Sequence, residues 1–418
     1  MKLSMRRINF GKLIVFQLLL AAQICLTINA GAQQFNFEGD RTRDVIRFTM
    51  VKNLVIIPVY LNDQGPFNFI LDTGVGPMII TDPGLIDSLG IKVSRSIKIS
   101  GLGRGAEIDA FVSNDLSAKV GRSGIVNIPA AILKKDIFGL SNYLGMKIYG
   151  LLGYYFFKSF IVQLRYSGKR LLFGYPAAFG KIKGERVPIE ILGYKPYVNV
   201  ELESPGHQTL TLKMLVDNGA SHAISLERLN EKPFPVPVSS ISANLGVGMS
   251  GPIDGSIGRV SSLKVGTVLL KNVLASYPVY DDVAAKVILK DRNGNLGADV
   301  LSRFNITFDY EDHSMYLKKN GQFNRPFEHD MSGIELYLQD DGKKRHYFVS
   351  RIEPGSPAEK AGILIDDELV SINFLPALSY KLDEINNILK SSDGKQIILT
   401  IARNNELIIK LFKLKQRI

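Results

Sequence analysis

The feature that most constrains the fold is an internal repeat at an offset of 144 to 145 residues. Residues 69–74 read Phe-Ile-Leu-Asp-Thr-Gly, and residues 214–219 read Met-Leu-Val-Asp-Asn-Gly. A repeat of this length indicates two lobes of one fold, and we place them at residues 33–184 and 185–325. Further landmarks recur in the same order and at nearly the same spacing: Gly101-Leu102-Gly103 with 246–248, Ile108-Asp109 with 253–254, Leu152-Gly153 with 296–297, and 163–166 with 307–310.

Each lobe has the pattern of a β-hairpin that ends at an aspartate. Apolar runs at 54–61 and 67–71 flank a polar turn in the first lobe, and matching strands are expected at 197–202 and 210–216 in the second. Pro58 cannot donate a ladder hydrogen bond, so its strand should be an edge strand or carry a bulge there. The pattern predicts a mainly β chain in which Asp72 and Asp217 occupy turns at the ends of core strands.

An isolated Asp-Thr-Gly is most often a turn whose aspartate bonds its own backbone, but two copies in register favour a functional pair. The copies resemble the Asp-Thr-Gly motif of retropepsin-like and pepsin-like aspartic peptidases, and residues 149–153 and 295–297 resemble that family's apolar-apolar-Gly segment. The resemblance covers about residues 50–320. It implies a bilobal protease of two retropepsin-like β-barrel lobes, a catalytic dyad and supporting loop residues: Asp72, Asp217, Thr73, Gly74, Asn218 and Gly219.

The chemistry of such a pair explains why the motif occurs twice. Two carboxylates about 3 Å apart cannot both ionise easily, so they share one proton across the working range. One carboxylate can then deprotonate a bridging water while the protonated one donates a hydrogen bond to the peptide carbonyl. The resemblance therefore implies an aspartic endopeptidase that acts on peptide or protein substrates and needs neither a cofactor nor a metal.

Glycine-rich segments follow each aspartate by 29 residues. They resemble the retropepsin hairpins that close over substrate, and closure of such a flap excludes water from the site. The alternative is an ordinary surface hairpin whose glycines serve turn geometry. The glycines expected in the two flaps are Gly101, Gly103 and Gly105 in the first lobe and Gly246, Gly248 and Gly251 in the second.

Asn218 departs from the family pattern, in which threonine or serine usually follows the catalytic aspartate. The asparagine amide can both donate and accept hydrogen bonds, but it is longer than a hydroxyl and planar. This residue leaves open a catalytically impaired protein that binds peptides in its cleft without cutting them.

The C-terminal region, residues 330–418, resembles a small α+β PDZ domain. A strand, a Gly-Ser-Pro-Ala turn and a short helix follow one another at 347–363, and asparagine at 373 ends the next strand. Asp366 and Phe374 stand where glycine is common. PDZ domains bind a C-terminal peptide as an added strand, so the resemblance implies a groove lined by Gly333, Ile334, Leu336, Leu382 and Ile385. The alternative is a groove blocked by the protein's own chain.

The first 32 residues have the pattern of an export signal. Four basic residues precede an apolar run at 13–28, and small residues follow at 30–32, so cleavage is expected after Ala32. The run is too short for a membrane span, and no stable span is expected after cleavage. Export to the periplasm or the medium follows. Cys25 is the single cysteine, so the mature chain would have neither a disulfide nor a thiol nucleophile.

Other chemistry has little support in the sequence. The net charge falls from +11 to +7 when the signal is removed, and the remaining basic residues are scattered, which argues against a nucleic-acid partner. The five histidines have no metal-ligand spacing, and His222 is expected to be a polar loop residue. Three hypotheses remain: an endopeptidase, an inactive peptide-binding protein, and a scaffold whose only active surface is the PDZ-like groove.

Overall fold

The computed structural model describes residues 33–99, 107–204, 209–248, 251–279, 292–340, 342 and 344–418. The expected export signal and the first-lobe glycines Gly101, Gly103 and Gly105 therefore lie outside the described residues. Within the described ranges, no helix has both the length and the apolarity needed to cross a membrane. The chain is mainly β, which confirms the predicted fold class.

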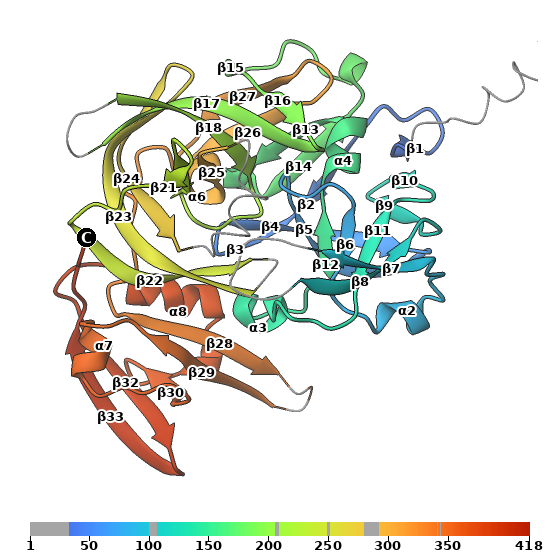
Figure 1. Cartoon of the computed structure of the whole chain (residues 1–418). Helices are drawn as coiled ribbons and strands as arrows, with labels where there is room; N and C mark the ends of the chain where they lie inside the picture. Colours follow the sequence, from blue (N-terminus) through green and yellow to red (C-terminus); the bar gives the residue numbers. More distant parts are fainter. Residues whose placement is uncertain are drawn as a thin grey trace, which may run out of the picture.

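The first lobe is a strongly curved sheet built around the hairpin of β4 and β5 (Figure 1). Three short helices accompany it: α2 (Leu85–Ser88), α3 (Leu140–Leu144) and α4 (Tyr154–Ser159). Its strands are β1 (Asn36–Phe37), β3 (Thr49–Val51), β4 (Leu54–Leu61), β5 (Gln64–Leu71), β6 (Met78–Ile80), β7 (Arg95–Ile99), β8 (Ile108–Ser113), β9 (Ala118–Val120), β10 (Ser123–Ile125), β11 (Ala130–Leu133) and β12 (Gly150–Leu152).

Pro58 was expected on an edge strand or at a bulge, and it lies in β4. On one side Pro58 lies opposite Asn68 of β5, and the register shifts between Val59 and Leu61. On the other side β3 pairs as far as Ile56 and β9 pairs from Tyr60 onward. Pro58 thus stands between two short partners, next to an irregularity, where its missing N–H leaves no ladder bond unmade.

The second lobe repeats this arrangement around the hairpin of β17 and β18. A two-stranded ribbon, β20 (Arg228–Leu229) and β21 (Lys232–Pro233), and helix α6 (Ala298–Leu301) accompany its sheet. The strands of that sheet are β16 (Glu190–Leu192), β17 (Lys195–Glu203), β18 (Thr209–Asp217), β19 (Ile224–Leu226), β22 (Ser240–Gly248), β23 (Gly251–Val265), β24 (Val268–Pro278) and β25 (Gly294–Gly297).

A third sheet joins the lobes, and its centre shows their symmetry. Strands β13 and β26 pair antiparallel, and Gln163 lies opposite Thr307, its own counterpart in the repeat. The Gln163 amide donates to the Thr307 hydroxyl at 2.9 Å. A residue that pairs with its own counterpart marks a local two-fold axis, so the two lobes face each other across this line. The sheet runs in the order β15 (Glu185–Pro188), β27 (Ser314–Lys319), β26 (Phe304–Asp309), β13 (Ile161–Arg165), β14 (Arg170–Gly174) and β2 (Arg43–Arg47), with 3₁₀ turns η1 (Tyr166–Gly168) and η2 (Pro176–Ala178).

The C-terminal module has a hydrophobic core of its own, separate from the core that the lobes share. Asp366 and Phe374 have φ of +67° and +68°, which explains why glycine is common at these positions. The elements are β28 (Ile334–Asp340), β29 (Arg345–Ile352), α7 (Pro357–Lys360), β30 (Glu368–Ile372), β31 (Leu375–Pro376), η3 (Ala377–Ser379), α8 (Leu382–Leu389), β32 (Gln396–Arg403) and β33 (Glu406–Lys413).

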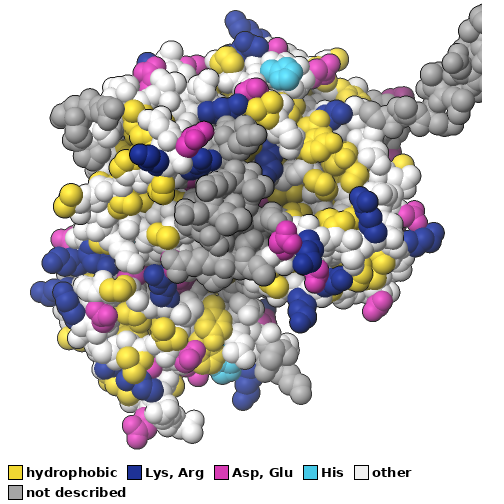
Figure 2. Space-filling view, in the orientation of Figure 1, with side chains coloured by type: hydrophobic (Ala, Val, Ile, Leu, Met, Phe, Trp, Pro, Cys, Tyr) yellow, Lys and Arg dark blue, Asp and Glu magenta, His cyan; other side chains and the backbone are white. Residues whose placement is uncertain are grey.

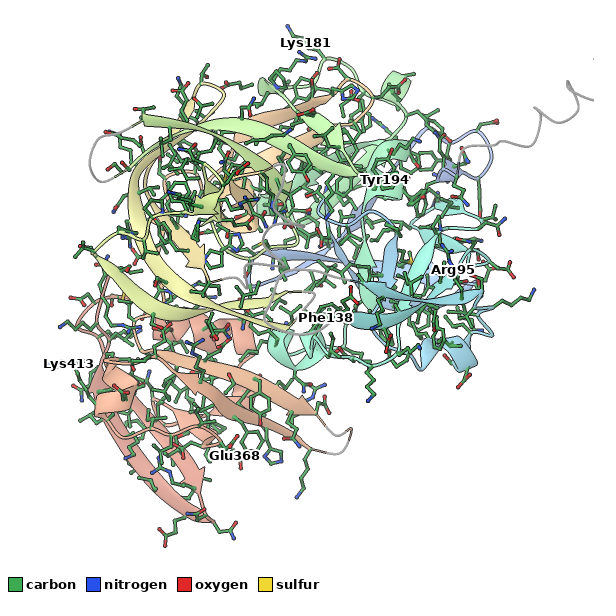
Figure 3. All side chains as sticks on the ribbon, viewed as in Figure 1. Arg95, Phe138, Lys181, Tyr194, Glu368 and Lys413 are labelled. Carbon is green, nitrogen blue, oxygen red and sulfur yellow. The ribbon has the colours of Figure 1, made fainter. Side chains whose placement is uncertain are left out.

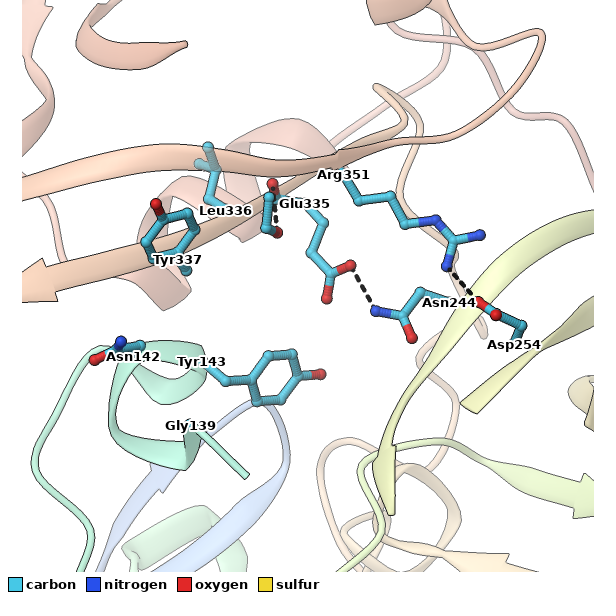
Figure 4. A pocket seen from close by; sticks show the side chains of 10 residues that line it. Gly139, Asn142, Tyr143, Asn244, Asp254, Glu335, Leu336, Tyr337 and Arg351 are labelled. Atoms are coloured by element: carbon cyan, nitrogen blue, oxygen red, sulfur yellow. Dashed lines mark hydrogen bonds and ion pairs between the residues drawn. The ribbon is translucent and has the colours of Figure 1, made fainter. Parts of the chain in front are cut away.

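The module packs against both lobes, below β22 and α3 in Figure 1. The Glu335 carboxylate of β28 accepts a hydrogen bond from the Asn244 amide of β22 at 2.8 Å. Arg351 of β29 lies 3.3 Å from the Asp254 carboxylate of β23. These residues and Tyr143 of α3 surround a cavity of about 480 Å³ where the first lobe, the second lobe and the module meet (Figure 4).

We predict that Glu335→Ala combined with Arg351→Ala loosens the β22–β23 hairpin, because two polar ties to the module, at Asn244 and Asp254, are lost while the bond from Arg259 to Ile418 O remains. Amide hydrogen exchange in 240–248 and 251–258 should become about threefold to tenfold faster, as expected for hydrogen bonds of ~1 kcal/mol. Glu406→Ala, at an exposed position on β33, is the control. Unchanged exchange in the double variant would show that the module does not restrain the hairpin.

Candidate active site

Each aspartate sits on a tight turn at the end of a core strand. The N–H of Asp72 donates to Leu152 O of the parallel strand β12 at 2.8 Å. The Gly74 N–H donates to Asp72 Oδ1 at 2.7 Å, and the Gly219 N–H donates to Asp217 Oδ1 at 3.1 Å. A Cβ at Gly219 would overlap the Asp72 carboxyl, so this position requires glycine.

The residues that follow the aspartates interlock the two turns. Thr73 Oγ1 donates to Val216 O at 2.7 Å and accepts the Asn218 N–H at 3.1 Å. Reciprocally, Asn218 Oδ1 accepts the Thr73 N–H at 2.7 Å, and Asn218 Nδ2 donates to Leu71 O at 2.9 Å. Both side chains are fully buried. The asparagine amide thus uses two atoms to make the bonds that the threonine makes with one hydroxyl.

The interlocked turns bring the two carboxyl groups together, and these share a hydrogen bond. Burial raises the pKa of Asp72 well above its usual range, and the neighbouring charge of Asp217 raises it further. Burial also raises the pKa of Asp217, but the nearby cations Arg292 and Lys195 lower it. The Asn295 amide donates to Asp217 Oδ2 at 3.0 Å. Both carboxyls therefore hold a proton more readily than an exposed aspartate does, and the two cations oppose this at Asp217.

A cleft of about 260 Å³ opens above the pair. Its wall includes Leu245, Gly246 and Gly248 of the β22–β23 hairpin. Gly251 begins β23 directly beyond the hairpin tip, whereas the corresponding first-lobe glycines lie outside the described residues. The second-lobe glycine segment is therefore positioned over the two aspartates, as a flap would be.

His222 also lines this cleft. The sequence favoured a polar loop position, but the ring is largely withdrawn from solvent, and burial with the nearby charge of Arg292 lowers its pKa to about 4. Its Nε2 is buried without a hydrogen-bond partner in the described part of the chain. The ring is therefore neutral at physiological pH. The described residues contain no cluster of histidine and acidic side chains suited to a metal ion.

Three charged residues of the cleft were missed by the sequence analysis. Arg292 Nε lies 2.9 Å from Glu227 Oε2, and these side chains are only 6% and 0% exposed, so they form a buried ion pair. Lys195, at the start of β17, lines the same cleft. The repeat offset of 144 to 145 does not align Lys195 with Leu54, and only the strand pairing makes these residues counterparts.

Comparison with known proteins agrees with this geometry. Residues 57–156 match the family model described as aspartyl protease, and residues 348–403 match that of the PDZ domain. The chain contains an aspartyl protease domain and a PDZ domain. The resemblance inferred from the motifs is thus confirmed for these two segments.

Two curated relatives match only in part. The chain is 24% identical over 137 residues to the probable 26S proteasome regulatory subunit p27 of Saccharomyces cerevisiae, which is 32% of this chain and 59% of that protein. It is 36% identical over 59 residues to the human 26S proteasome non-ATPase regulatory subunit 9, which is 14% of this chain and 26% of that protein. In both cases the match spans less than two thirds of the relative's length.

The protease lobe contacts both elements that border the expected PDZ groove. Ile334, Leu336, Leu382 and Ile385 are buried in the PDZ core. Between β28 and α8 lies Gly145, the C-cap of α3, where an added Cβ would stand 3.1 Å from Leu382 and 3.8 Å from Leu338.

Gly333 is packed within the PDZ module itself. A Cβ at Gly333 would overlap Ser356, and both residues are buried. Gly145 of the first lobe therefore stands against the expected groove, whereas Gly333 is confined by the N-cap of α7 in the same module.

The raised pKa of Asp72 predicts how stability depends on pH. An unfolded aspartate titrates near pH ~3.9, whereas folded Asp72 keeps its proton to higher pH, so its contribution to stability is lost as pH rises. Asp72→Asn removes this dependence and should raise Tm relative to the natural protein at pH 7, with the difference shrinking towards pH 4. Thermal unfolding of both proteins across this range is the measurement. A difference that is constant with pH would contradict the assigned protonation.

The interlock predicts an order of stability at position 218. Asn218→Ala leaves the Thr73 N–H and Leu71 O without partners, at a cost of ~1–3 kcal/mol for each buried group. Asn218→Thr restores one donor and one acceptor and should retain most of the stability. Asn218→Asp keeps the natural shape, but it replaces the Nδ2 donor with a carboxylate oxygen. Two acceptors then face each other at Leu71 O, so this variant should be destabilised at neutral pH. Denaturant unfolding of the series is the test, and equal stabilities would rule out the interlock.

Proposed function

We propose that the chain is an aspartic endopeptidase that hydrolyses peptide bonds with water activated between Asp72 and Asp217. The observation that carries the proposal is the interlock of Thr73 and Asn218, which holds two hydrogen-bonded carboxyls at the floor of a cleft. The match of residues 57–156 to an aspartyl protease supports the assignment to hydrolases.

In the proposed mechanism the two carboxyls have different roles. Asp217, ionised and held by the Asn295 amide, accepts a proton from the attacking water. Asp72 carries the proton and donates a hydrogen bond to the carbonyl oxygen of the scissile peptide, where negative charge develops. The proton taken up by Asp217 then passes to the leaving amine. The β22–β23 hairpin, with Gly246 and Gly248 facing the cleft, covers the substrate and excludes water.

Two observations bear on the alternative functions. Asn218 makes both loop-bridging bonds, so it gives no reason to expect lost turnover. Gly145 lies between β28 and α8, which disfavours a scaffold that acts only through an open PDZ groove. The PDZ domain suggests a peptide or protein ligand, and such a ligand would have to displace Gly145 and α3.

We also propose that the protein is exported and loses its first 32 residues. The basic, apolar and small-residue order of that segment supports the proposal. On the face shown in Figure 2, Lys and Arg side chains are interspersed with Asp and Glu rather than gathered in one patch. The mass of the intact protein recovered from its native host tests the cleavage after Ala32.

The dyad is tested with a fluorogenic peptide library at acidic to neutral pH. Asp72→Asn and Asp217→Asn should each reduce hydrolysis by at least about 10²-fold to 10⁴-fold, the usual contribution of a general acid or base. Circular dichroism and thermal unfolding show whether the variants are folded. Turnover by either folded variant at a rate comparable to the natural protein would discard the mechanism.

A further inference from the structure

The two walls of the cleft are built from equivalent positions of the repeat. In the first lobe Ile70 pairs with Leu151 and Ile56, and in the second Leu215 pairs with Asn295 and Tyr197. Two residues before Ile56 and Tyr197 are Leu54 and Lys195, which are therefore counterparts, as are Leu151 and Asn295. The pairings of β6 with β12 and of β19 with β25 likewise match Ile79 with Ser225.

All six counterparts line the cleft, but their chemistry differs. The first-lobe wall is apolar, with Leu54, Ile79 and Leu151, and Phe138 lies near α3 on the same side (Figure 3). The second-lobe wall has Lys195, Ser225 and Asn295 in their places. One backbone scaffold thus presents an apolar surface on one side of the aspartates and a polar, cationic surface on the other.

The two cations of the second wall differ in how they are paired. Arg292 forms a buried ion pair with Glu227. The Lys195 ammonium has no hydrogen bond or ion pair to any residue that the structure describes, although the side chain is partly buried. Three carboxylates, those of Asp217, Asp72 and Glu227, act on it electrostatically. Asp217 already accepts from Gly219 and Asn295, and Glu227 is paired with Arg292. A partly buried ammonium without a direct hydrogen-bonded partner is costly, and a carboxylate brought into the cleft would supply one.

From this asymmetry we infer that the second-lobe side of the cleft binds an acidic side chain of the substrate, recognised by Lys195, while the first-lobe side binds an apolar one. The scissile bond then lies between an apolar residue and an aspartate or glutamate. Ser225 and Asn295 provide hydrogen-bonding groups beside the ammonium. The inference rests on the proposed endopeptidase function and specifies its substrate class.

The test uses two pairs of matched peptides. In one pair Glu or Gln directly follows an apolar residue, and in the other pair Glu or Gln directly precedes it. The natural protein should favour the Glu peptide of one pair by about tenfold in kcat/KM. Lys195→Met keeps the length of the side chain and resembles the apolar Leu54 of the first lobe, so it should fold and lose this preference. Lys195→Glu should transfer the preference to a Lys peptide. Lys264→Met removes an exposed cation paired with Glu201 on the outer face and is the control.

The alternative role for Lys195 is to hold Asp217 ionised without touching substrate. In that case Lys195→Met would shift the pH profile of hydrolysis equally for every peptide and leave the ratio of kcat/KM between Glu and Gln peptides unchanged. That result would overturn the inference, while the hydrolysis itself would still support the proposed function. Calorimetric binding of the same peptide pairs to Asp72→Asn separates the two proposals. If the natural protein cuts no peptide, the function fails, and equal binding of Glu and Gln peptides would then also refute recognition by Lys195.

Discussion

The reciprocal hydrogen bonding of Thr73 and Asn218 is the interaction on which the site depends. Four buried hydrogen bonds join loops that are 145 residues apart in the chain. They fix the two aspartates closely enough to share a proton, although burial and mutual repulsion oppose that approach. Each bond lies deep in the core, where a donor or acceptor left without a hydrogen-bond partner costs the most stability. The electrostatic cost of the carboxyl pair is therefore offset by polar contacts immediately beside it.

The sequence predicted the mainly β class and the aspartyl protease and PDZ segments because each leaves a local signal. The aspartate turns recur in register, and the PDZ segment retains a long ordered motif. Positive φ at Asp366 and Phe374 shows that departures from a motif can still have its backbone geometry. Asn218 gives the same lesson for side chains, since it replaces a hydroxyl without loss of a hydrogen bond.

The features that the sequence did not predict are long-range ones. Periodicity identifies a strand but not its partner, so the sheet in which β2, β13, β14 and β15 meet β26 and β27 had no local signal. The pairing of Gln163 with Thr307 follows from the symmetry of the lobes, not from either segment alone. Lys195 and Arg292 escaped notice because they lie far from the aspartates in sequence, and which residues of β17 and of the segment before β25 face the cleft cannot be identified before the fold is known.

The position of the PDZ domain links its groove to the protease cleft through a short path of contacts. Lys52, in the turn before β4, donates its N–H to Asp383 of α8 at 3.3 Å, and its ammonium lies 3.4 Å from the centre of the Tyr143 ring. The adjacent Asn53 donates to Ser221 O at 3.2 Å, four residues beyond Asp217. Burial lowers the pKa of Lys52 to about 8, with the carboxylates of Glu335 and Asp383 opposing that shift.

This path has a consequence for any ligand of the PDZ groove. Gly145, at the end of α3, lies against Leu338 and Leu382, and Tyr143 of the same helix contacts the Lys52 ammonium. Glu335, next to that space, holds Asn244 of the hairpin over the cleft. A ligand that displaced α3 or Glu335 would therefore disturb contacts that reach the cleft wall.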